Sequence, residues 1–559
     1  MRWLALATIL VLPACGAGSQ RAAPIAKAPP QLPAPITVDG RARGAAYLTT
    51  VAQQLQPPWG QFLEDCRLRL GAAHPLNVPT LEARAELAID PSGKMTVVAV
   101  TTSGLVEFDL AVRQLLADAN RFGAPPVELL SDDDRLHLRW LFARDRRQAG
   151  PATAEIVTLE LPLIGVTEKL LGAGDLARAA RRIAASRNAD PDREAATEQV
   201  MVVALREALS STGAASRTSA VEAVGRAGVR TLASQVRGFL APTVDTDLRL
   251  AAIRAAAALG DSTAVPIMAR QLPADLANYP RLALAETAAL VQLGDRGAAA
   301  AAIQRVLEAD PEVPMVPALQ AYALVPVPAL APKLAAWFAT GDARTRAAVC
   351  TSVSAETPVP AFVLRGLRDA DATVRATCVD AATRQGRVRA VPAVVRRLRE
   401  LALDRDRVVR ARAVAALAVL DTARGLRAAS DPAPEVRAAA IPSATEAELR
   451  TMIGDPDPDV RAAAVSALAD KEPELIARAA TDVAPQVRRA AIAALVDLEV
   501  LERLAADVVP DVATDALVAL VRHRGRAAMT TPLLAQLASA PTGSAERVRI
   551  ALSWLLARP

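Results

Sequence analysis

A recurring pattern along the second half of the chain constrains its fold most. An acidic or Pro-containing turn is followed by a Val-Arg pair and then by an alanine-rich stretch, as in DPDPDVRAAAVSAL and DVAPQVRRAAIAAL. The arginines of the clearest copies are Arg375, Arg410, Arg437, Arg461 and Arg488. A period of about 20–50 residues is typical of solenoids, whose units bury their apolar faces against one another. We therefore predict an α-solenoid over residues 165–559.

Each copy also carries the signals of a helix start. In DPDPDVRAAAVSAL, Asp457 is placed to cap a helix and Pro458 to preset its first turn. Looser copies occur around Arg249 and before Gly294, and a degenerate one begins at Pro510. Slim alanine-rich helices of this kind pack closely, and stacking supplies the core that a single unit lacks. This explains how 52% of the residues are hydrophobic while only 3% are aromatic.

The repeat resembles HEAT repeats, particularly the short kind first described in phycobilin lyases, and over about residues 424–513 it also resembles leucine-rich-variant repeats. The resemblance implies that the second helix of each pair lines a concave face. It also implies that turn aspartates and helix arginines form ladders between repeats. The five arginines above would then be structural, with a ligand-binding arginine groove as the alternative. Such a solenoid presents an extended surface to another protein.

The first residues, MRWLALATILVLPAC, combine one Arg with an apolar run too short to span a membrane as a helix. We predict a signal peptide over residues 1–14. Its end, LPAC, resembles the lipobox of bacterial lipoproteins, which implies that Cys15 is acylated and becomes the first mature residue; an ordinary signal peptide is the alternative. Gly16 favours an outer-membrane lipoprotein facing the periplasm over inner-membrane retention. Residues 15–44, rich in Pro and Ala, are predicted to be a lipid-anchored spacer.

A small α+β domain is predicted over residues 45–164. Residues 81–89 alternate between apolar and charged side chains, which indicates a half-buried strand, and a DPSG turn leads to a second strand over 94–101. Apolar positions from Phe108 then follow a helical stripe, and a third strand places Leu136, Leu138, Trp140 and Phe142 on one face. The expected order is ββαβ.

This order, together with Thr102-Ser103-Gly104 before the helix and the later Pro125-Pro126, resembles the carboxy-terminal domain of the TonB family over about residues 45–145. The resemblance implies a periplasmic module that binds extended peptides of outer-membrane partners by strand addition. The edge implied for that contact is formed by Leu136, His137, Leu138, Arg139, Trp140, Leu141 and Phe142. Residues 156–161 alternate as a further strand, with Val157, Leu159 and Leu161 on one face, and would cover this edge if they paired beside it.

The sequence shows no catalytic or metal-binding motif. His74, His137 and His523 are far apart, and the loop Asp132-Asp133-Asp134 lacks the spacing of a calcium loop. We predict no cofactor, metal or small-molecule substrate. The net charge of +5 is spread among intervening acids, so no nucleic-acid patch is predicted.

The remaining cysteines leave alternatives open. Cys350 and Cys378 occupy nearly equivalent places in neighbouring repeats, so they form either a disulfide in an oxidising compartment or two buried small apolar residues. Cys66 has no evident partner.

The leading functional hypothesis is a non-enzymatic periplasmic scaffold whose solenoid docks envelope proteins, with the TonB-like domain as a second contact. The alternative is a TonB-like adaptor that binds extended peptides of outer-membrane receptors. A bilin-lyase-like enzyme ranks last, because an exported lipoprotein is the wrong place for that cytoplasmic chemistry.

Overall fold

A computed structural model describes residues 41–145, 150–309, 315–353, 360–384, 391–420, 428–469 and 471–557. The predicted signal peptide, Cys15 and the spacer as far as residue 40 lie outside the described residues. The chain divides into two compact units, residues 1–161 and 162–559. Within the described ranges, no helix has the length and apolar character needed to span a membrane.

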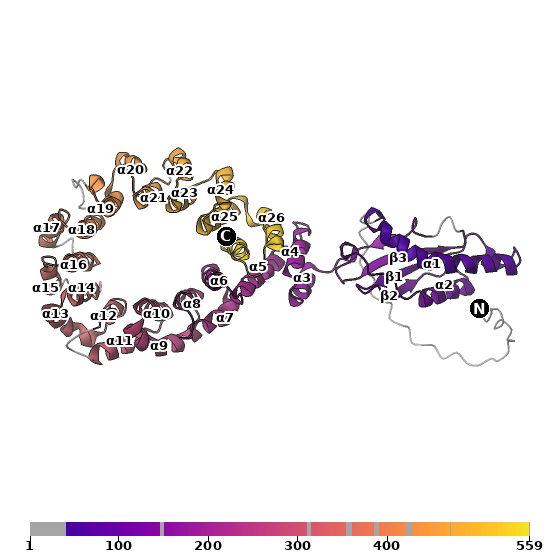
Figure 1. Cartoon of the computed structure of the whole chain (residues 1–559), viewed down its shortest axis with the longest axis horizontal. Helices are drawn as coiled ribbons and strands as arrows, with labels where there is room; N and C mark the ends of the chain where they lie inside the picture. Colours follow the sequence, from indigo (N-terminus) through magenta and orange to yellow (C-terminus); the bar gives the residue numbers. More distant parts are fainter. Residues whose placement is uncertain are drawn as a thin grey trace. The chain divides into compact units, whose positions relative to one another are not determined.

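The first unit is a small antiparallel sheet with helices against it (Figure 1). The strand order across the sheet is β2-β1-β3-β4, and every pair of neighbours is antiparallel. Its elements are α1 (Arg41–Arg69), β1 (Glu82–Ile89), β2 (Met95–Val100), α2 (Val106–Asp118), β3 (Leu136–Ala143) and β4 (Glu155–Val157). The predicted ββαβ order is present, preceded by a long helix.

The core of this unit lies between one face of the sheet and the helices α1 and α2. Alternate residues of β1 and β3 point into it, as the period of two predicts. Trp59 of α1 lies at its centre, with ring centroids 5.2 Å from Phe108 and 5.1 Å from Phe142, both edge-on. The Trp59 indole Nε1 donates to the Ala143 carbonyl at 3.3 Å, so the ring is buried without an unpaired donor.

The strand predicted at 156–161 is wrong in extent and in facing. β4 ends at Val157, and it is Ile156, not Val157, that is buried in the core. Side chains of the loop before β3 bind the backbone that follows β4. Ser131 Oγ accepts a hydrogen bond from the Leu159 N–H at 3.0 Å, and Asp132 Oδ2 accepts one from the Leu161 N–H at 3.0 Å. These bonds replace a strand ladder and lead the chain into the next helix.

The second unit is an α-solenoid that begins with α3 (Leu163–Gly172), α4 (Leu176–Ala184) and α5 (Arg193–Leu209). From there the helices form two layers (Figure 1). The inner helices are α6 (Ala214–Ala227), α8 (Thr246–Leu259), α10 (Pro280–Gln292), α12 (Val316–Tyr322), α14 (Ala343–Thr351), α16 (Ala372–Arg384), α18 (Arg407–Val419), α19 (Pro434–Ala440), α21 (Pro458–Ala467), α23 (Pro485–Ile492), α25 (Pro510–Arg524) and α27 (Ala545–Leu556). The outer helices are α7 (Ala233–Gly238), α9 (Val265–Asn278), α11 (Arg296–Ala309), α13 (Ala331–Thr340), α15 (Ala361–Gly366), α17 (Pro392–Leu401), α20 (Glu446–Met452), α22 (Pro473–Ala479), α24 (Leu498–Ala505) and α26 (Arg526–Ser539).

The solenoid closes on itself. Each inner helix packs against the next, and the last one, α27, packs against both α25 and α6. On the outside, α26 packs against α4, so the two ends of the repeat array meet along a seam. Figure 1 shows the resulting ring of helices. The predicted solenoid is therefore present, but its closure was not foreseen from the repeat pattern.

Small residues let the inner helices approach closely. A Cβ added at Gly225 of α6 would lie 2.8 Å from the Ala255 Cα of α8, which is too close for any side chain larger than hydrogen. The apolar core that runs through the unit consists mainly of Ala, Leu and Val. The scarcity of aromatic residues is thus matched by a fold with narrow spaces between its helices.

Candidate functional site

Shallow grooves lie between neighbouring inner helices in the described part of the ring, and three of them follow one another. One of about 470 Å³ lies between α8 and α10, with an apolar floor that includes Leu284, Ala285 and Ala288. A second, of about 500 Å³, runs from α10 past α12 and α14 to α16. A third, of about 260 Å³, lies between α16 and α18. Together they line one continuous stretch of the inner helices.

Exposed arginines lie on the helices that form these grooves, and four of them line a groove directly: Arg254, Arg281, Arg344 and Arg412. We call the set the basic arc; its members are Arg254 on α8, Arg281 on α10, Arg344 on α14, Arg384 on α16 and Arg412 on α18. Among the described residues, Arg254, Arg281 and Arg344 form no ion pair within 4.0 Å. Arg412 lies 3.6 Å from the half-buried Asp380, whose pKa is raised by burial although Arg412 and Arg384 oppose the shift. Arg384 donates to the Thr351 carbonyl at 3.0 Å, so Arg254, Arg281 and Arg344 are the guanidinium groups of the basic arc that are most available to an anion.

Acidic side chains also lie on the other inner helices. This acidic arc comprises Glu222 on α6, Glu435 on α19, Asp459 on α21, and Asp511 and Asp515 on α25. Arg226 and Arg489 lie among them and are ion-paired, both with Asp515, at 3.7 Å and 2.8 Å. Charges of both signs therefore occur along the inner helices, and Asp371, Asp380 and Asp406 line the second and third grooves beside the basic arc.

The five arginines predicted from the repeat pattern lie elsewhere, at the helix starts, and form a ladder. Each makes two hydrogen bonds to one aspartate in the turn of the following repeat; the pairs are Arg375–Asp404, Arg410–Asp431, Arg437–Asp455, Arg461–Asp482 and Arg488–Asp507. The same guanidinium donates to carbonyls of its own turn, as Arg461 does to Asp455 and Pro456. Each arginine therefore ties two successive turns together. Arg346, paired with Asp369 at 2.8 Å, is a further rung that the sequence pattern missed.

The ladder fixes the ionisation of its acids. Hydrogen bonds from Arg461 hold the pKa of Asp482 below its ordinary value, and those from Arg437 do the same for Asp455. Each ladder aspartate also closes its own turn, as Asp482 does by accepting from the Ala484 N–H at 2.8 Å. Four of the five N–H donors of each arginine are occupied, as in Arg461, so the ligand-binding alternative has little geometric basis at these positions.

A different arrangement surrounds Arg249 in α8. Its side chain is buried and reaches Asp275 of α9 and Glu286 of α10, with the Glu286 Oε1 at 2.8 Å. Burial, followed by the nearby Asp275, raises the pKa of Glu286 to about 9. One guanidinium thus serves two buried carboxyl groups, and Glu286 keeps a proton at neutral pH.

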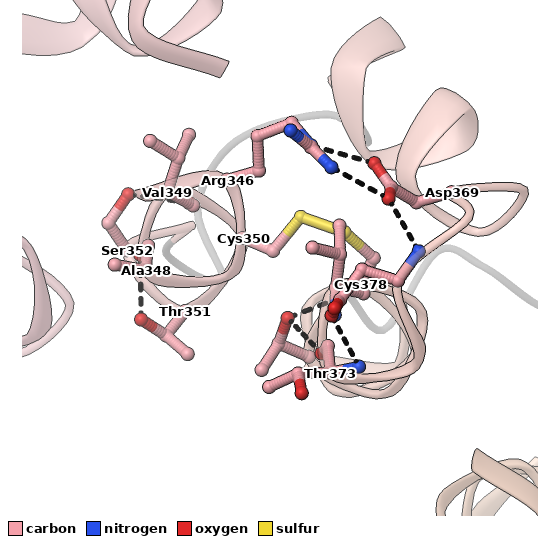
Figure 2. Close-up of a disulfide and its surroundings, with 12 residues drawn as sticks. Arg346, Ala348, Val349, Cys350, Thr351, Ser352, Asp369, Thr373 and Cys378 are labelled. Atoms are coloured by element: carbon pink, nitrogen blue, oxygen red, sulfur yellow. Dashed lines mark hydrogen bonds and ion pairs between the residues drawn. A yellow bond between two sulfur atoms is a disulfide. The ribbon is translucent and has the colours of Figure 1, made fainter. Parts of the chain in front are cut away.

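A disulfide joins α14 to α16. Cys350 and Cys378 are bonded, with a Cα–Cα distance of 5.1 Å, and the rung Arg346–Asp369 lies beside them (Figure 2). Gly366 permits this close approach, because a Cβ there would lie 2.3 Å from the Cys378 Sγ. Cys66, by contrast, is a buried free thiol in the first unit, and burial raises its pKa.

The predicted strand-addition edge is covered only in part. β4 pairs with His137, Leu138 and Arg139 of β3. Leu136, Trp140, Leu141 and Phe142 are paired with β1 on the other side, but not with β4. His137 contacts Asp133 at 2.8 Å, so the acidic loop is tied to β3. In the described parts of the chain, no cluster of three or more His, Cys, Asp or Glu residues is arranged to hold a metal ion.

The seam of the ring has its own set of polar contacts. Arg526 pairs with Glu194 at 2.7 Å and lies 3.5 Å over the Trp554 ring. Arg547, buried in α27, pairs with Glu207 of α5, and Arg193 of α5 donates to Thr531 of α26.

The basic arc was not foreseen, although the sequence holds a signal for it. Arg281 and Arg344 are each the second residue of their helix, α10 and α14. An alignment of the repeats on their helix starts would have shown that this second helical position faces the grooves.

No family model matches the chain, and no curated protein matches it either. Among solved structures, the chain is similar to one reported for Kap95p binding to RanGDP, with 13% identity and a TM-score of 0.26 over 68% of this chain and 59% of that one. It is also similar to Kap121p, with 12% identity and a TM-score of 0.26 over 67% of this chain and 53% of that one. A third similar structure is Cex1p, with 12% identity and a TM-score of 0.16 over 86% of this chain and 80% of that one. The chain thus spans little more than half the length of the first two. These scores are too low to carry an argument, and the solenoid assignment stands on the helix contacts described above.

Proposed function

We propose that this chain is a non-enzymatic scaffold of the bacterial cell envelope whose helical ring binds a partner protein on its inner face. The observation that carries the proposal is the continuous stretch of grooves and unpaired arginines on the inner helices. A repeating frame holds these side chains on rigid helices, as a binding surface requires.

Two further features support the envelope location. The Cys350–Cys378 disulfide is of a kind that persists in oxidising compartments such as the periplasm. The LPAC sequence at residues 12–15 supports lipidation of Cys15. Replacement of Cys15 by Ser should release the protein from the membrane fraction; a C15S protein that stays membrane-bound would contradict the anchor.

Photo-crosslinking in the full-length protein tests the binding face. p-Benzoylphenylalanine at Ala288 or Thr377, both beside grooves, should give an adduct with the same envelope protein, identified by mass spectrometry. The matched control is Ala274, an exposed position on the outer helix α9. Equal adducts from inner and outer positions, or none from the inner positions, would refute the proposed binding face.

A second candidate function is strand addition by the first unit, as a TonB-like adaptor. It is favoured by the part of β3 beyond Arg139 that β4 leaves unpaired. An alternating Thr-Val heptapeptide should then bind the full-length protein, and N-methylation of its backbone should abolish binding, because strand addition uses backbone N–H groups. Equal binding of the methylated peptide would exclude this mode.

A further inference from the structure

We infer that the basic arc binds an extended acidic segment of a partner protein, which lies across the inner helices from α8 to α18. This inference rests on the proposed function and names the chemical class of the partner. The supporting observation is that two kinds of arginine occur in the same ring. The ladder arginines have bidentate aspartate partners, whereas Arg254, Arg281 and Arg344 form no ion pair within the described part of the chain.

The surroundings of these arginines favour a polypeptide over a compact anion. Arg254 and Arg281 border the groove between α8 and α10, whose floor includes Leu284 and Ala288. A bound segment would therefore place carboxylates against the guanidinium groups and small apolar side chains on the floor. The three grooves follow one another along neighbouring helices, which suits a linear ligand.

Helix spacing suggests the period of such a segment. Packed helices lie about 8–10 Å apart, and a polyproline II segment repeats its face every three residues, at about 3.1 Å per residue. A segment in this conformation would pass one inner helix for each turn. We therefore expect an acidic residue at every third position, next to small or proline residues.

The acidic arc sets the limits of the site. Beyond α18, the second helical position is occupied by Glu435 in α19 and by Asp459 in α21, and both side chains repel a carboxylate. Inside the stretch from α8 to α18, Asp371 lines the second groove and Asp380 and Asp406 line the third. The carboxylates of the segment should consequently engage mainly Arg254, Arg281 and Arg344. Arg384 and Arg412 lie at its far end, where Asp380 already engages Arg412.

The test uses fluorescence anisotropy with the full-length protein and a labelled peptide of five Glu-Pro-Ala units. Binding should weaken about tenfold in the triple variant R254S/R281S/R344S, because three exposed charge pairs are lost. The matched control, R270S/R305S/R396S, removes three exposed arginines from the outer helices α9, α11 and α17 and should change binding less than twofold. Both variants should keep the melting temperature of the parent protein, since the replaced side chains are exposed.

Three results would overturn the inference. Equal weakening by both triple variants would show general charge attraction. Undiminished binding of a Gln-Pro-Ala peptide would show that carboxylates are not recognised. Tighter binding of a single-stranded oligonucleotide through the same three arginines would assign the arc to nucleic acid. If the inference fails while crosslinks at Ala288 persist, the scaffold function stands with a partner of other chemistry; loss of those crosslinks would remove the scaffold function itself.

Discussion

The ladder and the seam hold the same ring together in different ways. The ladder joins turns that are 18 to 29 residues apart through one repeated arginine–aspartate pairing. The seam joins residues more than 330 positions apart through contacts that differ from one another, such as Arg526–Glu194 and Arg547–Glu207. A repeated contact satisfies a local need of each unit. The seam depends on the curvature accumulated over all units, which no single repeat specifies.

The largest expected effect comes from a buried tryptophan that supports one side of the seam. Trp554 of α27 is 1% exposed, donates its Nε1 to Thr530 at 3.1 Å and underlies Arg526. Trp554→Ala should lower the free energy of unfolding by about 3–5 kcal/mol, as is usual for a buried aromatic residue. Urea unfolding measures the loss, and small-angle scattering of the folded variant should show a larger radius of gyration as the ring opens.

Glu546 provides the control for this substitution. It lies in the first turn of the same helix and is exposed, so Glu546→Ala should leave both stability and radius nearly unchanged. An unchanged radius in Trp554→Ala, with stability lost, would mean that the seam contributes stability but does not maintain closure.

A somewhat smaller effect is expected from the covalent link at the start of the ladder. The disulfide closes a loop with a sequence separation of 28 residues. On the chain-entropy estimate, its removal in C350A/C378A should cost about 3–4 kcal/mol. Denaturation of the parent protein with and without reductant measures the same quantity. A parent protein whose stability does not respond to reductant would contradict a stabilising role for the link.

A single rung should contribute less. Arg461→Ala leaves Asp482 partly exposed and without its partner, so a loss of about 1–2 kcal/mol is expected. Asp482 has a lowered pKa, so its contribution is present above about pH 3.8 and is lost as the pH falls through the folded value. The exposed Arg407, 3.5 Å from Glu435, is the control, and Arg407→Ala should cost about 0–1 kcal/mol. Equal losses at both positions would show that a ladder pair stabilises the protein no more than an exposed ion pair does.

The smallest effect at low pH is expected at Glu286. Because its folded pKa is raised to about 9 from 4.5, its contribution to stability is full below pH 4.5 and is lost as the pH rises through 9. Glu286→Gln keeps a neutral donor beside Asp275, so it should change stability by less than about 1 kcal/mol at pH 4.5. It should make the protein more stable than the parent at pH 9. Unfolding curves across this range measure both, and parallel pH profiles would refute a retained proton.

Periodic features of the sequence predicted much of this fold, because they reflect local requirements. The period of two in β1 and the helix signals at Asp457 and Pro458 appear in the structure as a half-buried strand and a capped helix. The end of β4 was missed because Ser131 and Asp132, which are distant in sequence, bind the backbone that follows.

The candidate site was less accessible to sequence reasoning. The Val-Arg arginines are conspicuous because their surroundings repeat, whereas Arg254, Arg281 and Arg344 have varied neighbours. Their shared property is a position beside a groove of the inner helices; an alignment of helix starts would reveal it for Arg281 and Arg344 but not for Arg254, which lies further along α8. The buried cluster of Arg249, Asp275 and Glu286 is harder still to predict, since it joins side chains of three helices.

Closure also changes how the array should come apart. An open row of repeats ends in units with one neighbour each, which need polar caps and fray first. In this ring every inner helix has a neighbour on both sides, including α6 and α27. No repeat of the ring is terminal, so unfolding has no preferred starting point. Slow amide exchange should accordingly be shared around the inner layer rather than fading toward the first and last repeats.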